Sequence, residues 1–348
     1  MPNASPIGLS TYQWNNNLKS FLVVATFPLL LIGLVALFFT FSSYALADPT
    51  GMVDPGPDLR QIFGLEPGRI PALDLGYLLS LAALPYVLGG SALWIGIGFL
   101  LNTTIIQGAA MARPITRLEQ PELYNLLENL CISRGIRMPK LYVIDTPALN
   151  AFASGLSDDS YAITLTSGLI EKLNKDEIEA VLGHELTHIM NRDVRLVVLT
   201  VLFTGMLAFA GEILLRMFSH NTSYRSRSRE RGSGVVPFLL LAIVILLIGR
   251  LLATLLRLAL SRRREYMADA GSVELTKRPD AMISALEKIS GKADMPFVPS
   301  GVRAMMIENP PGLLSLFDTH PPIAARIAVL RRIGNLPEKG ESLIPSVG

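Results

Sequence analysis

Residues 20–47 read SFLVVATFPLLLIGLVALFFTFSSYALA, 28 residues without a charged side chain. A helix of this length extends about 42 Å, more than the roughly 30 Å hydrocarbon core of a bilayer. The run ends in Ala-Leu-Ala, which imitates a signal-peptidase site, but it is longer than the apolar part of a signal peptide, and only one basic residue, Lys19, precedes it. We therefore predict an uncleaved transmembrane helix over 20–47, preceded by a cytoplasmic segment, 1–19.

Three further apolar stretches indicate an integral membrane protein. Hydrophobic residues make up 50% of the 348 residues and charged residues only 17%, against about 25% charged in soluble domains. Residues 72–101 hold a second long run, whereas the runs within 193–218 and 235–260 are shorter and bordered or interrupted by charges. We predict about four transmembrane or membrane-embedded helices, and the lengths of the last two leave open whether they cross fully.

The positions of the basic residues predict which side of the membrane each segment faces. Lys and Arg near the ends of spans favour the cytoplasmic side. The loop 48–71 has two arginines among four acids and is predicted to be external, whereas arginines follow the second and fourth helices at 113, 117 and 262–264. Both termini and the soluble part therefore belong in the cytoplasm. The Arg-rich loop 219–234 conflicts with this topology, which places a basic loop on the external side. Either the last two helices do not cross the membrane, or the loop is an exception to the rule and is solvated or contacts lipid head groups.

The remaining segments, 102–192 and 261–348, predict one lobe of helices around a small β-sheet. Leucines recur at helical spacing within 120–134, residues 141–145 indicate a strand, and 151–155 with 161–166 indicate a hairpin. Asn174 and Glu177 stand three residues apart, as in a capping box, and predict the start of a helix. The segment from Pro337 is typical of a disordered tail. The predicted fold class is a mainly α membrane protein with a cytoplasmic α+β lobe.

Residues 184–188 read HELTH and fit the H-E-x-x-H pattern. On a helix, His184 and His188 lie on one face and can bind one metal ion. Glu185 can face a water molecule at that metal and act as a general base. Zinc lowers the pKa of such a water to about 7. The competing interpretation, a helix with incidental exposed histidines, is disfavoured because only four histidines occur in the chain and two of them fall here.

A catalytic zinc needs a third protein ligand from elsewhere in the sequence. Residues 264–269 read REYMAD and place Glu265 and Asp269 four residues apart on a predicted helix. Glu265 can be the ligand, and Asp269 can accept the N–H of a ligating histidine and fix its tautomer. A surface acidic pair that balances the arginines at 262–264 fits the spacing equally well.

Four motifs together carry a family resemblance: LNAFASG at 149–155, LGHELTH at 182–188, REYMAD at 264–269 and THPP at 319–322. With these motifs in this order, the chain resembles the HtpX-type membrane zinc metallopeptidases, relatives of the CAAX prenyl proteases, from the first span to about Arg332. The resemblance implies a gluzincin-like lobe that binds one Zn²⁺ per chain through His184, His188 and Glu265, with Glu185 as the base. It thereby favours Glu265 as the third ligand.

Three more residues are candidates for the site. His320 precedes two prolines that stiffen the backbone, and it can donate to the oxyanion; an ordinary loop histidine is the alternative. Arg326 can pair with an acid of the site, bind a peptide carboxylate, or be solvated on a helix surface. Asn150 begins a predicted strand, where its amide can hold a substrate backbone while the strand edge adds an extended peptide. Its alternative is a turn residue.

The predicted function is hydrolysis of peptide bonds by a metal-activated water. The resemblance implies protein or peptide substrates, namely damaged or misfolded membrane proteins, and a location in the bacterial inner membrane. The positions of the basic residues place the active site on the cytoplasmic side, and the spans contact lipids. A CAAX-type prenyl protease is the nearest alternative, but it has more spans; a non-catalytic zinc-stabilised membrane scaffold would have no need of Glu185.

The net charge of +2 gives no indication of a nucleic-acid partner, and the one cysteine, Cys131, excludes an intramolecular disulfide. Nothing in the sequence defines the oligomeric state.

Overall fold

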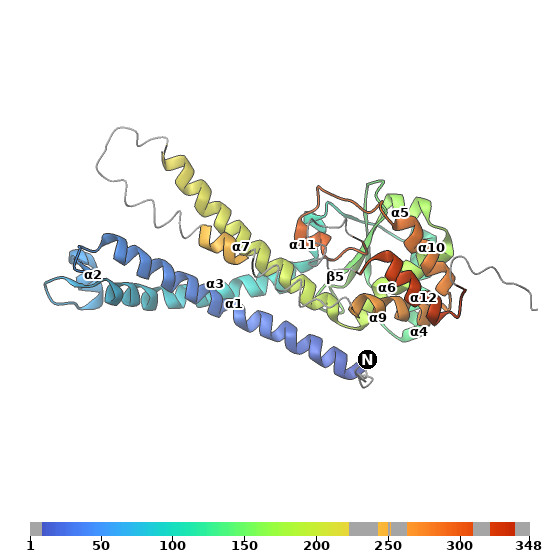
Figure 1. Ribbon diagram of the computed structural model, residues 1–348, viewed down its shortest axis with the longest axis horizontal. Coiled ribbons are helices and arrows are strands. Elements are labelled where there is room, and N and C mark those ends of the chain that lie inside the picture. Colours follow the sequence, from blue (N-terminus) through green and yellow to red (C-terminus); the bar gives the residue numbers. More distant parts are fainter. Residues whose placement is uncertain (1–8, 223–242, 250, 252–262, 309–320, 338–348) are drawn as a thin grey trace, which may run out of the picture. The chain divides into compact units, whose positions relative to one another are not determined.

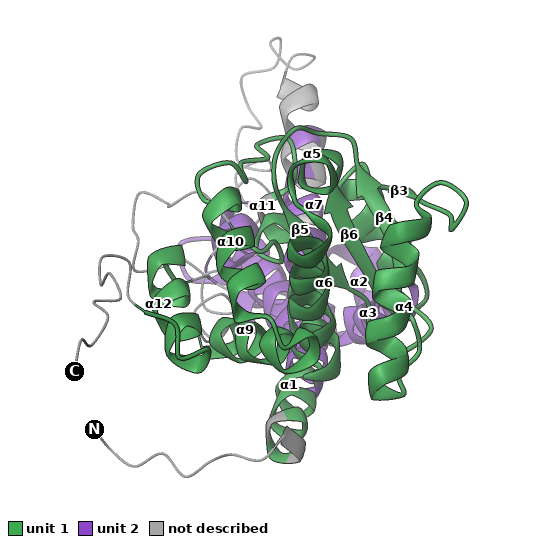
Figure 2. Ribbon diagram, turned by 90° about the vertical axis from the view of Figure 1, so that its right-hand side faces the viewer, with its two compact units in different colours: residues 1–20, 99–201, 254–348 green, residues 21–98, 202–253 purple. Residues whose placement is uncertain are grey.

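The computed structural model of the chain describes residues 9–222, 243–249, 251, 263–308 and 321–337. The chain divides into two compact units, coloured separately in Figure 2. Unit 1 takes residues 1–20, 99–201 and 254–348, and unit 2 takes 21–98 and 202–253. The predicted fourth membrane helix, 235–260, and the Arg-rich loop, 219–234, lie largely outside the described residues, as does His320.

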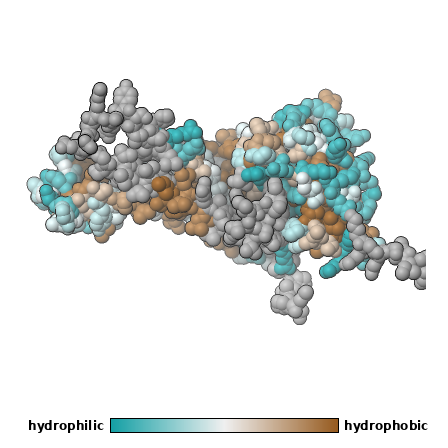
Figure 3. Space-filling model, turned by 45° about the horizontal axis from the view of Figure 1, so that its top comes forward, coloured by the Kyte–Doolittle hydropathy of each residue, from teal (hydrophilic) through white to brown (hydrophobic). Residues whose placement is uncertain are grey.

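Two long apolar helices, α1 (Leu9–Leu46) and α3 (Ala72–Ala109), form most of unit 2 and continue into unit 1. In the described part of the chain, two stretches are long and apolar enough to cross a membrane, Gln13–Leu46 and Ala72–Ala109. Their large side chains are exposed, as at Phe21 (66%) and Tyr86 (79%), and hydrophobic surface lies along this part of the molecule (Figure 3). Such exposure suits helices surrounded by lipid.

Within unit 2, α1 and α3 lie side by side (Figure 1). They approach closely at Gly76, where a Cβ atom would lie 2.7 Å from the Cα of Thr40. Small residues allow this kind of packing between membrane helices. The aromatic rings of Phe27 and Phe203 stack with their centroids 4.3 Å apart and so join α1 to α7 (Asp193–Thr222), which covers the predicted third membrane helix.

The loop that joins α1 to α3 is ordered. Two short antiparallel strands, β1 (Met52–Val53) and β2 (Ile70–Pro71), enclose a helix, α2 (Gly56–Phe63). Arg60 pairs with Asp54 at 2.8 Å, and Arg69 pairs with Asp48. Each arginine of the predicted external loop therefore pairs with one of the four acids of that loop.

Unit 1 contains a four-stranded sheet in the order β3-β4-β6-β5. Its strands are β3 (Arg113–Pro114), β4 (Lys140–Ile144), β5 (Ala151–Ser154) and β6 (Ala162–Thr166). β4 and β6 are parallel, and the other two pairs are antiparallel, so the predicted hairpin forms and leaves β5 at an edge. From α3, the side chain of Gln107 contacts this hairpin, donating to Ser154 Oγ (3.0 Å) and accepting from Thr164 (2.9 Å).

The helix α6 (Lys175–Met190) lies in the middle of unit 1 (Figure 2). It packs against β5 on one side and against α9 (Arg263–Thr276) and α10 (Pro279–Ile289) on the other. The unit is completed by α4 (Pro121–Arg134), α5 (Ser167–Lys172), α11 (Ser300–Arg303) and α12 (Ile323–Ile333). α6 and α9 come so close that a Cβ atom at Gly271 would lie 2.3 Å from Thr187 Cγ2. This approach brings REYMAD to the HELTH motif.

The capping box predicted for the start of α6 is present. Asn174 Oδ1 accepts from the N–H of Glu177 (3.0 Å), and the Glu177 carboxylate accepts from the N–H of Asn174 (2.7 Å). The same carboxylate also accepts from Ser284 Oγ (2.6 Å) and Lys288 Nζ (2.7 Å) on α10. One acidic residue therefore caps the metal-site helix and connects it to its neighbour.

Acidification should remove the stabilising effect of Glu177. Burial raises the pKa of this carboxyl, but the hydrogen bonds from Lys288, Ser284 and Asn174 outweigh it and hold the pKa below its ordinary value. A carboxyl with a lowered pKa stabilises the fold above its unfolded pKa, about 4.3, and that stabilisation is lost as pH falls through the lower folded value. We expect the melting temperature of wild type to fall more steeply than that of Glu177→Gln below about pH 4. Thermal unfolding in detergent from pH 7 to pH 3 measures this, and parallel curves would contradict it.

Candidate metal centre

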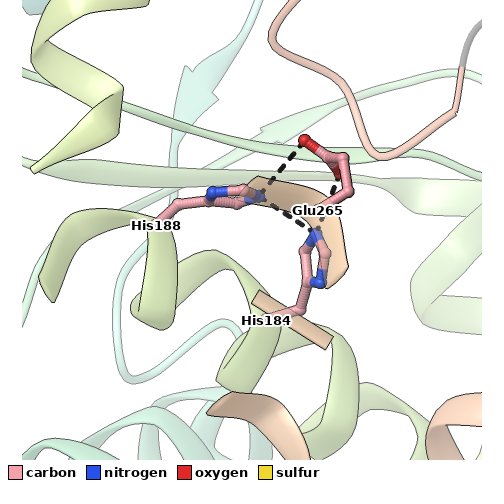
Figure 4. Close-up of side chains that lie close together, drawn as sticks. All are labelled: His184, His188 and Glu265. Atoms are coloured by element: carbon pink, nitrogen blue, oxygen red, sulfur yellow. Dashed lines mark hydrogen bonds and ion pairs between the residues drawn. The ribbon is translucent and has the colours of Figure 1, made fainter. Parts of the chain in front are cut away.

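Three potential ligands meet where α6 and α9 pack together. His184 Nε2 and His188 Nε2 lie 3.1 Å apart. Glu265, from α9, places its carboxylate oxygens 3.7 Å from His184 Nε2 and 3.8 Å from His188 Nε2. All three residues are buried, and Figure 4 shows the carboxylate facing both imidazoles. The structure thus brings together the three residues that the sequence predicted.

A second nitrogen of each imidazole contacts a carboxylate. His184 Nδ1 lies 2.9 Å from Asp269 Oδ1, and His188 Nδ1 lies 3.1 Å from Asp193 Oδ2. A neutral histidine that donates Nδ1–H to such a carboxylate presents the lone pair of Nε2. Two lone pairs directed at each other across 3.1 Å repel unless a cation lies between them. Tetrahedral zinc, with bonds of about 2.0–2.1 Å, holds its ligand atoms roughly 3.3 Å apart, so the donor set fits this ion.

The electrostatics of the centre favour a positive charge between these groups. Burial lowers the pKa of His184, but the carboxylates of Asp269 and Glu265 outweigh burial and raise the pKa above its ordinary value. A divalent cation at this position would satisfy both imidazoles and the carboxylate of Glu265.

Asp269 is in turn held by a buried arginine. Arg326, on α12, donates to Asp269 Oδ1 through Nη2 (2.6 Å) and to Asp269 Oδ2 through Nε (2.8 Å). Its Nη1 donates to the carbonyl of Ile307 (3.0 Å), and the side chain is fully buried. Burial alone would raise the pKa of Asp269, but the charge of Arg326 outweighs burial and holds the pKa below its ordinary value, so the carboxyl stays ionised. The sequence left three roles open for Arg326, and the structure contains one of them, the ion pair with an acid of the site, Asp269. Contact between Arg326 and a substrate carboxylate stays a prediction.

Glu185 is buried beside a small pocket. Ligand His188 lines the same pocket, and so do Ala153 of β5 and Arg264. Burial raises the pKa of Glu185, and the two histidines partly offset this effect. The pocket therefore combines a potential base, a metal ligand and a strand edge.

Asn150 lies just before β5 and is buried, and its side-chain amide makes hydrogen bonds within the protein. Nδ2 donates to the carbonyls of Ala293 and Glu308, each at 2.9 Å, and Oδ1 accepts from the N–H of Ile307 (3.1 Å). These bonds fix the start of the edge strand. A direct contact between Asn150 and a substrate stays a prediction, as does the role of His320, which lies outside the described residues.

Two residues of the centre were missed by sequence reasoning. Asp193 holds His188, and its signal was an acidic residue five positions after a predicted ligand. Arg264 is buried next to the ligand and donates from Nε to Glu265 Oε1 (3.1 Å). In the sequence, only its position next to Glu265 pointed to a role for Arg264, because a run of three arginines is also typical of a solvated surface.

Asp193→Asn should weaken metal binding while keeping the shape of the side chain. An amide cannot supply the negatively charged acceptor that orients the His188 imidazole, and replacing such partners typically costs about 10–100-fold in metal affinity. We expect the zinc dissociation constant to rise by about that factor, measured by competition with a chelator in detergent. Asp176→Asn, at a half-exposed position on α6, is the control. Equal affinities for wild type and Asp193→Asn would contradict the role of Asp193.

Residues 117–334 match the model described as Peptidase family M48. A protein described as "Protease HtpX homolog" from Bacteroides fragilis (strain YCH46) is 40% identical over 336 residues, which cover 94% of this chain and 99% of that protein. Another with the same description, from Streptococcus uberis, is 39% identical over 237 residues, covering 67% of this chain and 80% of that protein. The crystal structure of S. mikatae Ste24p aligns with a TM-score of 0.45 and 21% identity, covering 70% of this chain and 58% of that chain.

Proposed function

The chain belongs to peptidase family M48, as the resemblance to HtpX-type enzymes predicted, and we propose that it is a zinc endopeptidase of the bacterial inner membrane that degrades damaged or misfolded membrane proteins. That it is a metallopeptidase acting on proteins or peptides follows from the family and from the His184, His188 and Glu265 cluster. The observation that carries the proposed chemistry is Glu185, which shares one pocket with ligand His188.

The residues around this pocket have separate roles in peptide hydrolysis. His184, His188 and Glu265 would hold a zinc ion, which would supply Lewis acidity to the scissile carbonyl and to a water molecule. Glu185 accepts the proton of the attacking water and returns it to the leaving amine. Its raised pKa makes it a stronger base than an exposed carboxylate. Asp269 and Asp193 keep the two imidazoles oriented with Nε2 toward the metal.

The edge of β5 is the place where a substrate backbone would lie. β5 pairs with β6 on one side only, and its Ala153 lines the pocket of Glu185. An extended peptide can add to such an edge through main-chain hydrogen bonds, which do not depend on its sequence. The carbonyl of Ala151 already accepts from the N–H of Ile307 (2.9 Å), so pairing with a substrate would centre on Ala153. This mode suits unfolded segments of many different proteins.

Location in the membrane rests on separate observations. Two helices in the described part of the chain are long and apolar enough to cross a bilayer, and arginines follow the second of them at 113 and 117. By the positive-inside rule, this arrangement favours a cytoplasmic position for the catalytic pocket. An enzyme fixed in this way meets substrates that emerge from the same membrane.

Cleavage of a membrane protein in two folding states tests the proposed function. The full chain would be reconstituted in liposomes with a stable membrane protein or with a destabilised variant of it. We expect faster cleavage of the destabilised form, and no cleavage by Glu185→Gln or in the presence of chelator. Equal rates on both forms would remove the quality-control role but leave the peptidase standing. Cleavage restricted to prenylated C-terminal peptides would favour the CAAX-type alternative, and loss of stability without any cleavage would favour the scaffold.

A further inference from the structure

The metal-site helix ends in a strained junction. α6 ends at Met190 and α7 begins at Asp193, the residue that holds His188. Between them, Arg192 adopts a left-handed backbone conformation with φ of +58°, which a side chain with a Cβ disfavours. The direction of the Asp193 carboxylate depends on this turn. Anything that fixes the junction therefore also fixes the partner of a metal ligand.

The N-terminal helix α1 supplies hydrogen bonds to that junction. Gln13 Nε2 donates to the carbonyl of Met190 (2.7 Å), and Asn16 Nδ2 donates to the carbonyl of Asn191 (3.1 Å). Carbonyls at the end of a helix lack partners within the helix and need donors from elsewhere. Gln13 and Asn16 are three residues apart, so one face of α1 presents both amides. All four residues belong to unit 1.

Burial makes these contacts specific. Asn16 is 5% exposed and Asn191 is 3% exposed, so water cannot readily replace the amide if it is removed. Asn17, by contrast, is half-buried, and its side chain makes no hydrogen bond within the described part of the chain.

We propose that α1 is a positioning element of the metal centre: Gln13 and Asn16 hold the Met190–Asp193 junction in the conformation that directs Asp193 onto His188. The inference rests on the proposed function insofar as it requires the metal. Among the described residues, α1 is also long and apolar enough to cross a membrane. The affinity for zinc thus depends on the contacts that Gln13 and Asn16 make with the junction.

The zinc dissociation constant of the full-length chain tests this role. Competition with a chelator at 20 °C would compare wild type, the double variant Gln13→Ala/Asn16→Ala and the control Asn17→Ala. Direct partners of ligating histidines typically contribute about 10–100-fold, and a contact one step further out should contribute about tenfold or less. We expect the double variant to bind zinc about three- to tenfold more weakly, while Asn17→Ala matches wild type.

Two further measurements separate positioning from general stability. Thermal unfolding of the metal-free chains identifies a merely structural role, which lowers the melting temperature but leaves the zinc dissociation constant unchanged. Gln13→Ala alone, at a half-buried position, provides a milder variant if the double variant does not fold. Zinc affinity equal to wild type in both variants would overturn the proposal while the proposed function stands. If wild type binds no zinc, the proposed function fails, and this inference fails with it.

Discussion

Glu185→Gln should lower the rate of peptide hydrolysis by about 10²- to 10⁴-fold, the usual contribution of a general base. The amide has nearly the same shape as the carboxylate but cannot accept a proton from water. Glu185 is buried beside ligand His188 and makes none of the ligand contacts described for Glu265, so the variant should still bind zinc. Cleavage of an unfolded model protein, with zinc content measured on the same sample, gives both results.

Glu179→Gln is the matched control, because Glu179 lies on the same helix at a half-exposed position. It should cleave at the wild-type rate. If Glu185→Gln cleaves as fast as this control, Glu185 is not the base. If Glu185→Gln loses its zinc, the residue contributes to metal binding, and its loss of activity has a different cause.

Arg326→Met should destabilise the fold by about 3–5 kcal/mol, the effect of leaving one charge of a buried pair without its partner. Methionine approximates the length of the aliphatic part of arginine but offers no donor to Asp269 or to the carbonyl of Ile307. Both members of the pair are fully buried, so water cannot substitute. Chemical denaturation in mixed micelles measures the change in the free energy of unfolding.

Two further variants make the Arg326 result specific. Arg332→Met, at an exposed position on the same helix, should change stability by less than about 0.5 kcal/mol. Adding Asp269→Asn to Arg326→Met should recover part of the loss, because the neutral amide no longer needs a positive partner. A stability for Arg326→Met equal to that of Arg332→Met would show that the pair does not support the fold.

Local sequence patterns predicted the parts of the structure that depend on neighbouring residues. The capping box of Asn174 and Glu177 forms because both partners lie within one helical turn. His184 and His188 converge because positions four apart share a helix face. The long apolar run at 20–47 lies in α1 except for Ala47, and the run at 72–101 lies in α3. In each case, residues close together in the sequence determine the local structure.

Contacts between distant segments could not be predicted in this way. Asp193 reaches His188 only because the chain turns through Arg192 at positive φ, which no periodicity encodes. Gln13 meets Met190 across 177 positions of the sequence. Arg326 resembles a residue of a basic surface helix, yet the packing of α12 buries it on Asp269. Local pattern brings His184 and His188 together, whereas the packing of α9 on α6 adds Glu265 and determines the surroundings of the ligands.

The zinc K-edge X-ray absorption spectrum of the purified full-length chain, recorded together with its zinc content, tests the proposed metal centre most directly. We predict one zinc per chain, bound by two imidazoles and by oxygen ligands, with the imidazole signal unchanged and the affinity reduced in Glu265→Gln. A chain that binds no zinc after reconstitution, or a spectrum with sulfur ligands or without two imidazoles, would contradict a centre built from His184, His188 and Glu265.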